Sequence, residues 1–592
     1  MIGFKHKNLF SPVFILALAV LILSACSSRV AREGDSGQAA VVPPQAPAQE
    51  LGKPQSVTAG AEHEPLTADL LYDVLLGEIA GQRGELDISG KSYLDAARES
   101  NDPRIAERAL KITLYGQQSE DALEAARRWV SLAPENLEAH QALAALALRN
   151  GEQQEAQDEF EYLLAHGGQG DVDPYKPVLA LLAREPDKER ALAVMEQLSA
   201  QRPDDADACF AHARLAIHAD QWASAEQQVN RCLVLRPDWT EALILRAQIQ
   251  IKQDKGEQAR RDLDEALQRN PGDAALRTAY ARLLVDLDDY DAARAQYHEL
   301  MQQQPDNGAV VYALALLSLE NGQYDEAGGL FERMVELDFQ PQQAWYYLGA
   351  IEEEQKHYRK ALQWYDKVEE GSDHWIEVQI RMARLEAEAG DVGDARERLR
   401  SLRLGQPTQA QRLYLVEGEI LAGIGQYEEA FGLYTEYLAS QPDDLDILYA
   451  RSLVAERLDR LDIAESDLQT ILKREPDNVR ALNALGYTLA NRTTRYHEAF
   501  GYIEKAYKQT PNDPAVMDSM GWVLFRLGRY ADARTLLQKA YNETGDAEIA
   551  AHLGEVMWVM GDKQLARALW EDVRKKSPED PVLEDTVRRL DR

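Results

Sequence analysis

The sequence predicts an all-α superhelical solenoid of about 13–15 helix-pair repeats, followed by a C-terminal capping helix. Three periodic features predict this fold. Alanine recurs every 34 residues in the series Ala191, Ala225, Ala259, Ala293, Ala327, Ala361 and Ala395. A proline follows many of these alanines by 12 residues, as at Pro203, Pro237, Pro271 and Pro305. A large aromatic residue often follows by four residues, as at Tyr297, Phe331 and Tyr365.

The chemistry of these residues explains the period. Two antiparallel helices pack closely where one side chain at the crossing is small, so the alanine marks a helix crossing. Proline cannot continue a helix, and the Asp or Asn that usually follows it can cap the next one. We therefore expect a repeat array over residues 137–580. Two degenerate helix pairs are expected over 66–136, and residues 581–592 carry Leu583, Val587 and Leu590 on one helical stripe, which predicts a cap.

Charge and composition limit the classes of partner. Lys and Arg total 65 and Asp and Glu total 100, which gives a net charge of −35 over 592 residues. A chain this acidic repels nucleic acid phosphates and anionic lipid head groups, so we expect no nucleic acid partner. Two interpretations stay open: the acidic residues keep a long surface soluble, or they attract partners with basic patches.

The N-terminus predicts a membrane anchor. Lys5 and Lys7 precede an apolar run that is too short to span a bilayer, so residues 1–25 are expected to be a signal peptide. The following "LSAC" resembles a bacterial lipobox, which implies cleavage before Cys26 and attachment of acyl chains such as palmitate to that residue. Ser27, rather than Asp, resembles the outer-membrane sorting pattern. The alternative is an ordinary signal peptide with a chance cysteine. Residues 26–65 are polar and proline-rich and predict a disordered tether.

Motifs for catalysis are missing from the sequence. HExxH, a phosphate-binding loop and a nucleophile elbow are all absent, and the 11 histidines have no metal-ligand spacing. "DLDDYD", from Asp286, lacks the glycine and glutamate of a calcium loop, and we interpret it as a solvated turn. We expect no enzyme, no cofactor and no metal site.

Two cysteines remain besides Cys26. Cys209 lies on the first helix of its repeat and Cys232 on the second, and antiparallel pairing brings these positions near one another. A periplasmic location would permit a disulfide, and two buried reduced thiols are equally reasonable.

Large aromatic residues near the C-terminus predict a binding groove. Positions 5, 9 and 12 of a first helix lie about 100° around the axis from the face that meets the second helix, and are expected on the concave surface. Trp522 and Phe525 of repeat 514–546 occupy such positions, as do Tyr487 of repeat 479–513 and Trp558 of repeat 547–580. Exposed aromatic rings in a groove are typical of peptide recognition. The alternative is packing between adjacent first helices or under the cap.

Two further sets of residues complete the predicted surfaces. Asn483 and Arg526 lie on the same side or its margin and could bind a carboxylate or backbone group of a partner. A weaker second patch consists of Tyr312, Leu316, Leu319 and Tyr346.

The whole pattern resembles one family. "WYYLGAIEEEQKHYRKALQWY", from Trp345, matches the W-x2-L-G and A-x3-aromatic pattern of the tetratricopeptide repeat (TPR). Together with "LSAC", the tether, "LGYTLANRTTRYHEAFGYIEKAY" and "MDSMGWVLFRLGRYADA", it is similar to large proteobacterial TPR lipoproteins. That resemblance implies a non-catalytic scaffold on the periplasmic face of the outer membrane. It would bind and activate a periplasmic carboxy-terminal processing protease and bring it substrates such as peptidoglycan cross-link hydrolases. A scaffold for polysaccharide export or outer-membrane assembly, and an unrecognised envelope enzyme, are the alternatives.

Overall fold

The computed structural model describes residues 67–168, 173–577 and 580–590, and these residues contain 31 α-helices, one short 3-10 helix and no strand. The prediction of an all-α solenoid is confirmed. The predicted signal peptide, the predicted lipidation site Cys26 and the predicted tether all lie outside the described residues. Two compact units divide at residues 327 and 328, within α17 (Tyr324–Glu336), and each is described by itself.

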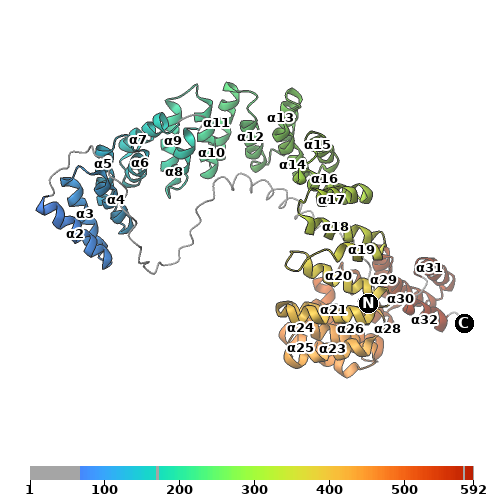
Figure 1. The fold of residues 1–592 in the computed structure, drawn as a ribbon. Helices are drawn as coiled ribbons and strands as arrows, with labels where there is room; N and C mark the ends of the chain where they lie inside the picture. The colour runs from blue at the N-terminus through green and yellow to red at the C-terminus, as the bar shows by residue number, and fades with distance from the viewer. Residues whose placement is uncertain (1–66, 169–172, 578–579, 591–592) are drawn as a thin grey trace. The chain divides into compact units, whose positions relative to one another are not determined.

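The first unit consists of stacked helix pairs that run from blue to green in Figure 1. Its helices are α2 (Ala68–Gln82), α3 (Leu86–Glu99), α4 (Pro103–Tyr115), α5 (Ser119–Leu132), α6 (Leu137–Asn150), α7 (Gln153–His166), α8 (Tyr175–Leu182), α9 (Lys188–Ala200), α10 (Ala206–His218), α11 (Trp222–Leu235), α12 (Thr240–Lys252), α13 (Gly256–Arg269), α14 (Ala274–Asp286), α15 (Tyr290–Gln303) and α16 (Gly308–Glu320).

The second unit continues the same pairing to the end of the chain. Its helices are α18 (Pro341–Glu354), α19 (Tyr358–Tyr365), α20 (Trp375–Glu388), α21 (Val392–Gly405), α22 (Ala410–Gly423), α23 (Tyr427–Ser440), α24 (Leu445–Arg457), α25 (Leu461–Arg474), α26 (Val479–Arg492), α27 (Tyr496–Gln509), α28 (Pro514–Arg526), α29 (Tyr530–Thr544), α30 (Ala547–Val559), α31 (Lys563–Lys576) and α32 (Pro581–Leu590). The short 3-10 helix η1 (Pro407–Gln409) precedes α22, and α32 packs on α30 and α31.

The turns between helices keep the period of the sequence. The left-handed residues Asp220, Asp254, Asp288 and Gly322 are each 34 residues apart, with φ between 58° and 69°. Only glycine and, less readily, Asp or Asn adopt this conformation at low cost, which explains the residue types at this position. Asp288 lies in "DLDDYD", between the end of α14 and the start of α15, so the interpretation of that segment as a turn is confirmed.

The acidic and amide residues after the prolines cap the next helix. In each of six repeats the residue two positions after the proline accepts hydrogen bonds from backbone N–H groups of the first turn: Asp205, Asp273, Asn307, Asp444, Asn478 and Asp513. These bonds satisfy amide groups that the helix itself leaves unpaired. The capping prediction made from the sequence is therefore confirmed at these six positions.

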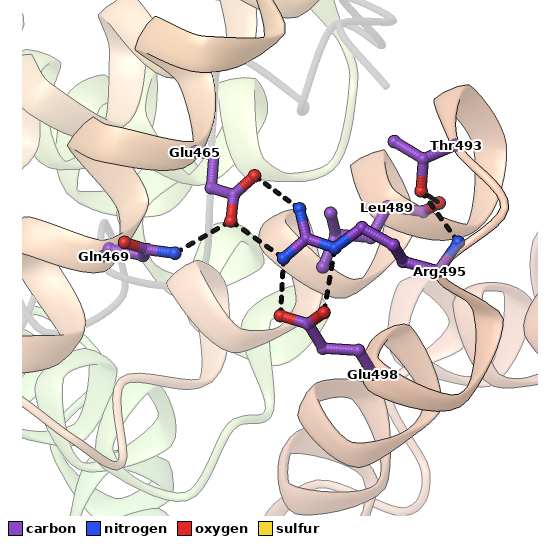
Figure 2. A network of polar contacts seen from close by, with 6 residues as sticks. All are labelled: Glu465, Gln469, Leu489, Thr493, Arg495 and Glu498. Carbon is purple, nitrogen blue, oxygen red and sulfur yellow. Dashed lines mark hydrogen bonds and ion pairs between the residues drawn. The ribbon is translucent and has the colours of Figure 1, made fainter.

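One repeat is a residue longer than its neighbours, and its turn is built differently. Thr493 is extended, and its hydroxyl donates to the carbonyl oxygen of Leu489 at 2.6 Å and accepts the backbone N–H of Arg495 at 3.0 Å. The Arg495 guanidinium binds Glu465 at 2.7 and 3.0 Å and Glu498 at 2.6 and 2.8 Å, as Figure 2 shows. Gln469 donates to Glu465 at 2.8 Å. The longer turn is thus connected to the preceding repeat by a charged network.

Glycine on a first helix makes room for a large side chain on the second. A Cβ atom added to Gly418 would lie 2.1 Å from Cζ of Tyr434, and one added to Gly554 would lie 2.0 Å from Nε1 of Trp570. Real Cβ atoms do not approach other atoms so closely, so these pairs fit only because glycine has no side chain. This is the structural reason for the glycine in the TPR pattern.

We expect Gly418→Ala to lower the free energy of unfolding by about 1–3 kcal/mol, because the new methyl group displaces the Tyr434 ring. The matched control is Gly432→Ala in α23, where an added Cβ meets nothing within 4 Å. That change should be neutral or stabilising by up to about 1 kcal/mol, since alanine favours helix. Urea unfolding followed by circular dichroism measures both. Equal effects of the two substitutions would contradict this explanation.

Candidate functional site

The predicted groove residues lie on the first helices of the last three repeats. Asn483 and Tyr487 belong to α26, Trp522, Phe525 and Arg526 to α28, and Trp558 to α30. α28 contacts both α26 and α30. Residues that are 35 or more positions apart in the sequence therefore meet because the first helices of successive repeats stack.

Three of the predicted aromatic rings gather around a histidine that the sequence did not single out. Trp522 stacks on His552 with ring centroids 4.2 Å apart, and the Tyr487 ring lies 6.0 Å from His552. Phe525 packs against Trp522 at 5.2 Å. Trp558 is not part of this group: it stacks on Trp570 at 5.8 Å.

Accessibility differs from what the sequence predicted. Trp522 is 5% exposed, so the expectation that its ring is an exposed contact surface is wrong. Trp522 is buried because its ring stacks on His552 of α30. This is the packing between adjacent first helices that the sequence analysis gave as the alternative. The other five predicted residues are partly exposed: Tyr487, Phe525, Trp558, Asn483 and Arg526.

A buried polar centre lies beneath these rings. The side chain of Asp518 is fully buried, and its Oδ1 lies 2.8 Å from Nδ1 of His552. Tyr487 donates its hydroxyl to Oε1 of Glu548 at 2.8 Å and lies 3.4 Å from Nε2 of His552. Tyr487 on α26 thus reaches α30, two repeats further along the chain.

The electrostatics of the centre follow from this arrangement. Burial by itself would lower the pKa of His552, but the adjacent Asp518 carboxylate raises it above its ordinary value. Burial, together with the neighbouring Glu548 carboxylate, raises the pKa of Tyr487 well above its ordinary value, so its hydroxyl remains a donor. His552 and Glu548 were missed by sequence reasoning. The available signal was their spacing of four residues, which places both on one face of α30.

Three buried polar atoms of this cluster have no hydrogen-bond partner in the described structure: Oδ2 of Asp518, Nε1 of Trp522 and Oδ1 of Asn483. Buried polar atoms are almost always paired, so each of these requires an explanation.

Arg526 is directed toward a neighbouring ring. Its guanidinium donates to the hydroxyl of Tyr496 at 2.5 Å and lies 4.8 Å from the centre of that ring. The cation that the sequence assigned to partner binding is therefore engaged within the protein, by α27.

The second predicted patch is buried. The exposed fractions of Tyr312, Leu316, Leu319 and Tyr346 are 4–5%, so the expectation of an exposed patch is wrong. α16 is apolar on nearly every face, and such a helix lies in the interior. In the second unit, Tyr346 stacks on His374 with ring centroids 4.3 Å apart.

Cys209 on α10 and Cys232 on α11 are buried free thiols in the structure, where α10 and α11 pack against one another. Burial raises the pKa of Cys232 to about 12, which makes its reactive thiolate scarce at neutral pH. The structure therefore matches the second alternative, two buried reduced thiols, and no disulfide joins Cys209 to Cys232 in it.

The structure reveals an apolar surface that the sequence did not predict. Four large side chains of α2 are strongly exposed: Leu71 (44%), Tyr72 (64%), Leu75 (52%) and Ile79 (49%). The side of α2 that meets α3 instead carries small buried residues, Gly77 and Ala80. We call Leu71, Tyr72, Leu75 and Ile79 the α2 face. These exposed apolar side chains share one side of the helix and form a candidate interaction surface.

Over residues 67–168, 173–577 and 580–590, no group of His, Cys, Asp and Glu has the arrangement of a metal site. In the same ranges, no helix has the length and hydropathy needed to cross a bilayer.

Stacked helix pairs with exposed faces define a helical-repeat protein that binds other proteins. Models of the tetratricopeptide repeat match residues 250–317 and 287–351, and 380–444, 449–514 and 519–581. The chain is 40% identical over 550 residues to the TPR repeat-containing protein PA4667 of Pseudomonas aeruginosa, covering 91% of this chain and 90% of that protein. The chain therefore belongs to the tetratricopeptide repeat proteins, a family of protein-binding scaffolds that are generally non-catalytic.

Two more distant similarities complete the comparison. The human protein O-mannosyl-transferase TMTC1 is 24% identical over 183 residues, which is 30% of this chain and 20% of that protein. A chain in the crystal structure of the APC/C hetero-tetramer Cut9–Hcn1 is also similar. The match covers 89% of this chain and 97% of the Cut9–Hcn1 chain, with 13% sequence identity and a TM-score of 0.30.

Proposed function

We propose that this protein is a lipid-anchored scaffold on the periplasmic face of the outer membrane. It binds and activates a carboxy-terminal processing protease and presents substrates such as peptidoglycan cross-link hydrolases. Within the family, the sequence resembles LbcA, the lipoprotein adaptor of the protease CtpA. The lipobox-like "LSAC", the polar segment 26–65 and the repeat array support this proposal.

The observation that carries the proposal is the α2 face. A solvent-exposed surface with Tyr72 and three aliphatic side chains has the composition of the centre of a protein interface. The repeats supply further surface on which a second protein can be held. Holding protease and substrate on one solenoid raises their effective concentration, so a scaffold can accelerate cleavage without contributing catalytic residues.

Reconstitution tests the proposal. The purified protein is mixed with the carboxy-terminal processing protease of the same organism and a peptidoglycan cross-link hydrolase, and loss of intact hydrolase is followed over time. We expect cleavage to be accelerated by at least about tenfold when the scaffold is present, and no cleavage by the scaffold alone. Hydrolysis by the scaffold alone would support the envelope-enzyme alternative. Unchanged protease activity would favour a scaffold for export or outer-membrane assembly.

The α2 face gives a sharper prediction. We expect the double change Leu71→Asp and Leu75→Asp to reduce stimulation of the protease by about tenfold or more, because each removes an apolar anchor worth over about 1 kcal/mol. Both side chains are exposed, so circular dichroism should show unchanged helix content. The matched control is Leu404→Asp on α21, whose side chain is 78% exposed and lies outside the face. Equal stimulation by the double variant and the control would contradict docking at α2.

A further inference from the structure

We propose that the α2 face binds an amphipathic helix of the partner protein, and that this helix places a Lys or Arg side chain beside Asp69 and Asp73. The proposal rests on the proposed function, in which the α2 face holds the protease, and it states which element the protease presents there. The shape of the α2 face indicates the helix, and the charge at one edge of the face indicates the basic residue.

The α2 face has the side-chain pattern that receives another helix. Leu71, Leu75 and Ile79 are spaced by four residues and therefore form one ridge along α2, with Tyr72 beside it. Ridges of this kind pack into the grooves between the ridges of a second helix. The four side chains are 44–64% exposed, so no helix in the described part of the chain covers this ridge.

The position of α2 in the array explains why this side is open. Later first helices pack on the second helix of the preceding pair, as α4 packs on α3, α6 on α5 and α12 on α11. α2 is the first helix that the structure describes, and it packs on α3. At the other end of the array, α32 packs on α30 and α31. A helix seated on the α2 face therefore takes the place of a preceding repeat.

One edge of the α2 face carries two carboxylates without a cation. At about 100° per residue, Asp69 and Asp73 lie about 60° and 100° beyond Tyr72 around the helix axis. α2 contains no Lys or Arg, and neither carboxylate forms an ion pair with another described residue. Burial raises the pKa of Asp73, and the neighbouring carboxylates of Asp95 and Asp69 raise it further. Because like charges at this spacing repel, a cation placed at this edge is stabilising.

The two edges of the α2 face differ in how their charges are paired. Asp69 lies in the first turn of α2, where the positive end of the helix dipole favours a carboxylate, whereas Asp73 lies one turn further along. At the opposite edge, Glu78 accepts a hydrogen bond from Arg108 at 3.0 Å. The basic side chain of the partner is therefore expected at the edge that carries Asp73.

Other occupants of the α2 face fit these observations less well. A second copy of the chain would bring the three carboxylates of its own α2 to the interface and no cation from that helix. In residues 26–66 the only large aliphatic side chains are Leu51, Leu66 and four valines, and none of these is four residues from another. An anionic lipid surface would be repelled by Asp69 and Asp73. A basic amphipathic helix of another protein matches both the ridge and the charge.

Designed fluorescent peptides of about 18 residues, long enough to form a helix in water, test the proposal. All carry leucines spaced by four residues. Two isomers of equal net charge carry lysines either beside this leucine row or on the opposite side of the helix, and a third peptide carries glutamates beside the row. Binding to the purified protein is measured by fluorescence anisotropy. We expect the isomer with flanking lysines to bind about threefold to fivefold more tightly than the other isomer, and the glutamate peptide to bind most weakly. Equal binding of the two lysine isomers, or a preference for the glutamate peptide, would overturn the proposal.

Variants of Asp73, whose side chain is partly exposed, connect this preference to the edge of the α2 face. Asp73→Asn should remove most of the difference between the two lysine isomers, and Asp73→Lys should make the glutamate peptide the tighter ligand. The matched control is Asp394→Asn, which removes the same charge from an exposed position in the first turn of α21 and should leave the difference intact. Circular dichroism checks the helix content of each variant. Where Asp73→Lys does not fold, Asp73→Asn decides, and an unchanged difference in that variant overturns the proposal.

Two further measurements test the other occupants. Sedimentation with vesicles of phosphatidylethanolamine and phosphatidylglycerol detects lipid binding, and analytical ultracentrifugation detects dimers. Either result would overturn the proposal if the double change Leu71→Asp and Leu75→Asp abolished it.

Stimulation of the protease is measured separately, so the two proposals fail in different ways. If the double change abolishes stimulation but flanking lysines have no effect on peptide binding, the scaffold function stands and the basic-helix site fails. If no protease is stimulated but the preference for flanking lysines depends on Asp73, the basic-helix site stands and the proposed function fails.

Discussion

Glu417→Ala should be among the most destabilising single changes in the second unit, lowering the free energy of unfolding by about 3–5 kcal/mol. Glu417 is 2% exposed and lies on α22, where its carboxylate accepts hydrogen bonds from Arg396 at 3.0 Å and from Arg403. Both arginines come from α21, and the Arg403 side chain is only 12% exposed. Removal of the carboxylate leaves Arg403 as a buried charge without its partner.

A matched control separates burial from the mere presence of an ion pair. Arg396 also pairs with Glu429, whose side chain is 47% exposed. Because solvent screens this second pair, Glu429→Ala should cost less than about 1 kcal/mol. Urea unfolding of both variants measures the difference. Replacing Glu417 and Arg403 together by leucine should recover much of the stability, since no charge is then buried. Similar losses for Glu417→Ala and Glu429→Ala would show that burial is not the cause.

Local rules explain how much of the fold was predictable. The alanines at the crossings, the capping Asp and Asn residues and the left-handed turn residues each act within a few positions of the chain. Asp205 caps α10 two residues after Pro203, and Asp288 turns the chain between α14 and α15. The conformational role of each of these residues follows directly from the chemistry of its own side chain. Repetition then fixes the solenoid without any knowledge of distant contacts.

The candidate site depends on geometry that no local rule contains. Periodicity placed Tyr487 and Trp522 away from the face that meets the second helix of their own repeat, and both side chains contact residues of α30. It could not show that the hydroxyl of Tyr487 donates a hydrogen bond to Glu548, which lies 61 positions further along the chain. That contact depends on the rotation between successive repeats. For the same reason it could not choose between an exposed and a buried Trp522. Position in the repeat placed Arg526 at the margin of the predicted groove, but its bond to Tyr496 depends on side-chain packing that position alone does not contain.

Tyr365→Ala should lower the free energy of unfolding by about 3–5 kcal/mol, the range for removing a large buried aromatic side chain. The ring is fully buried, and its partner at the helix crossing is Gly349, where an added Cβ would lie 2.3 Å from Cε1 of Tyr365. A glycine has no side chain that could move into the vacated space. The Tyr365 hydroxyl also donates to Glu353 at 2.6 Å, and Arg381 donates to the same carboxylate oxygen at 3.3 Å.

Tyr365→Phe divides this effect into its two causes. It keeps the ring and removes the bond to Glu353, so we expect a loss of about 1.5–3 kcal/mol, the range for a hydrogen bond to a charged group. Amide hydrogen exchange shows which helices lose stability. Because each repeat contacts mainly its neighbours, faster exchange should be concentrated in α18, α19 and α20 and should fade toward α32. Uniformly faster exchange over residues 341–590 would instead show that the second unit unfolds as one cooperative body, and that a single helix crossing controls the stability of all its binding surfaces.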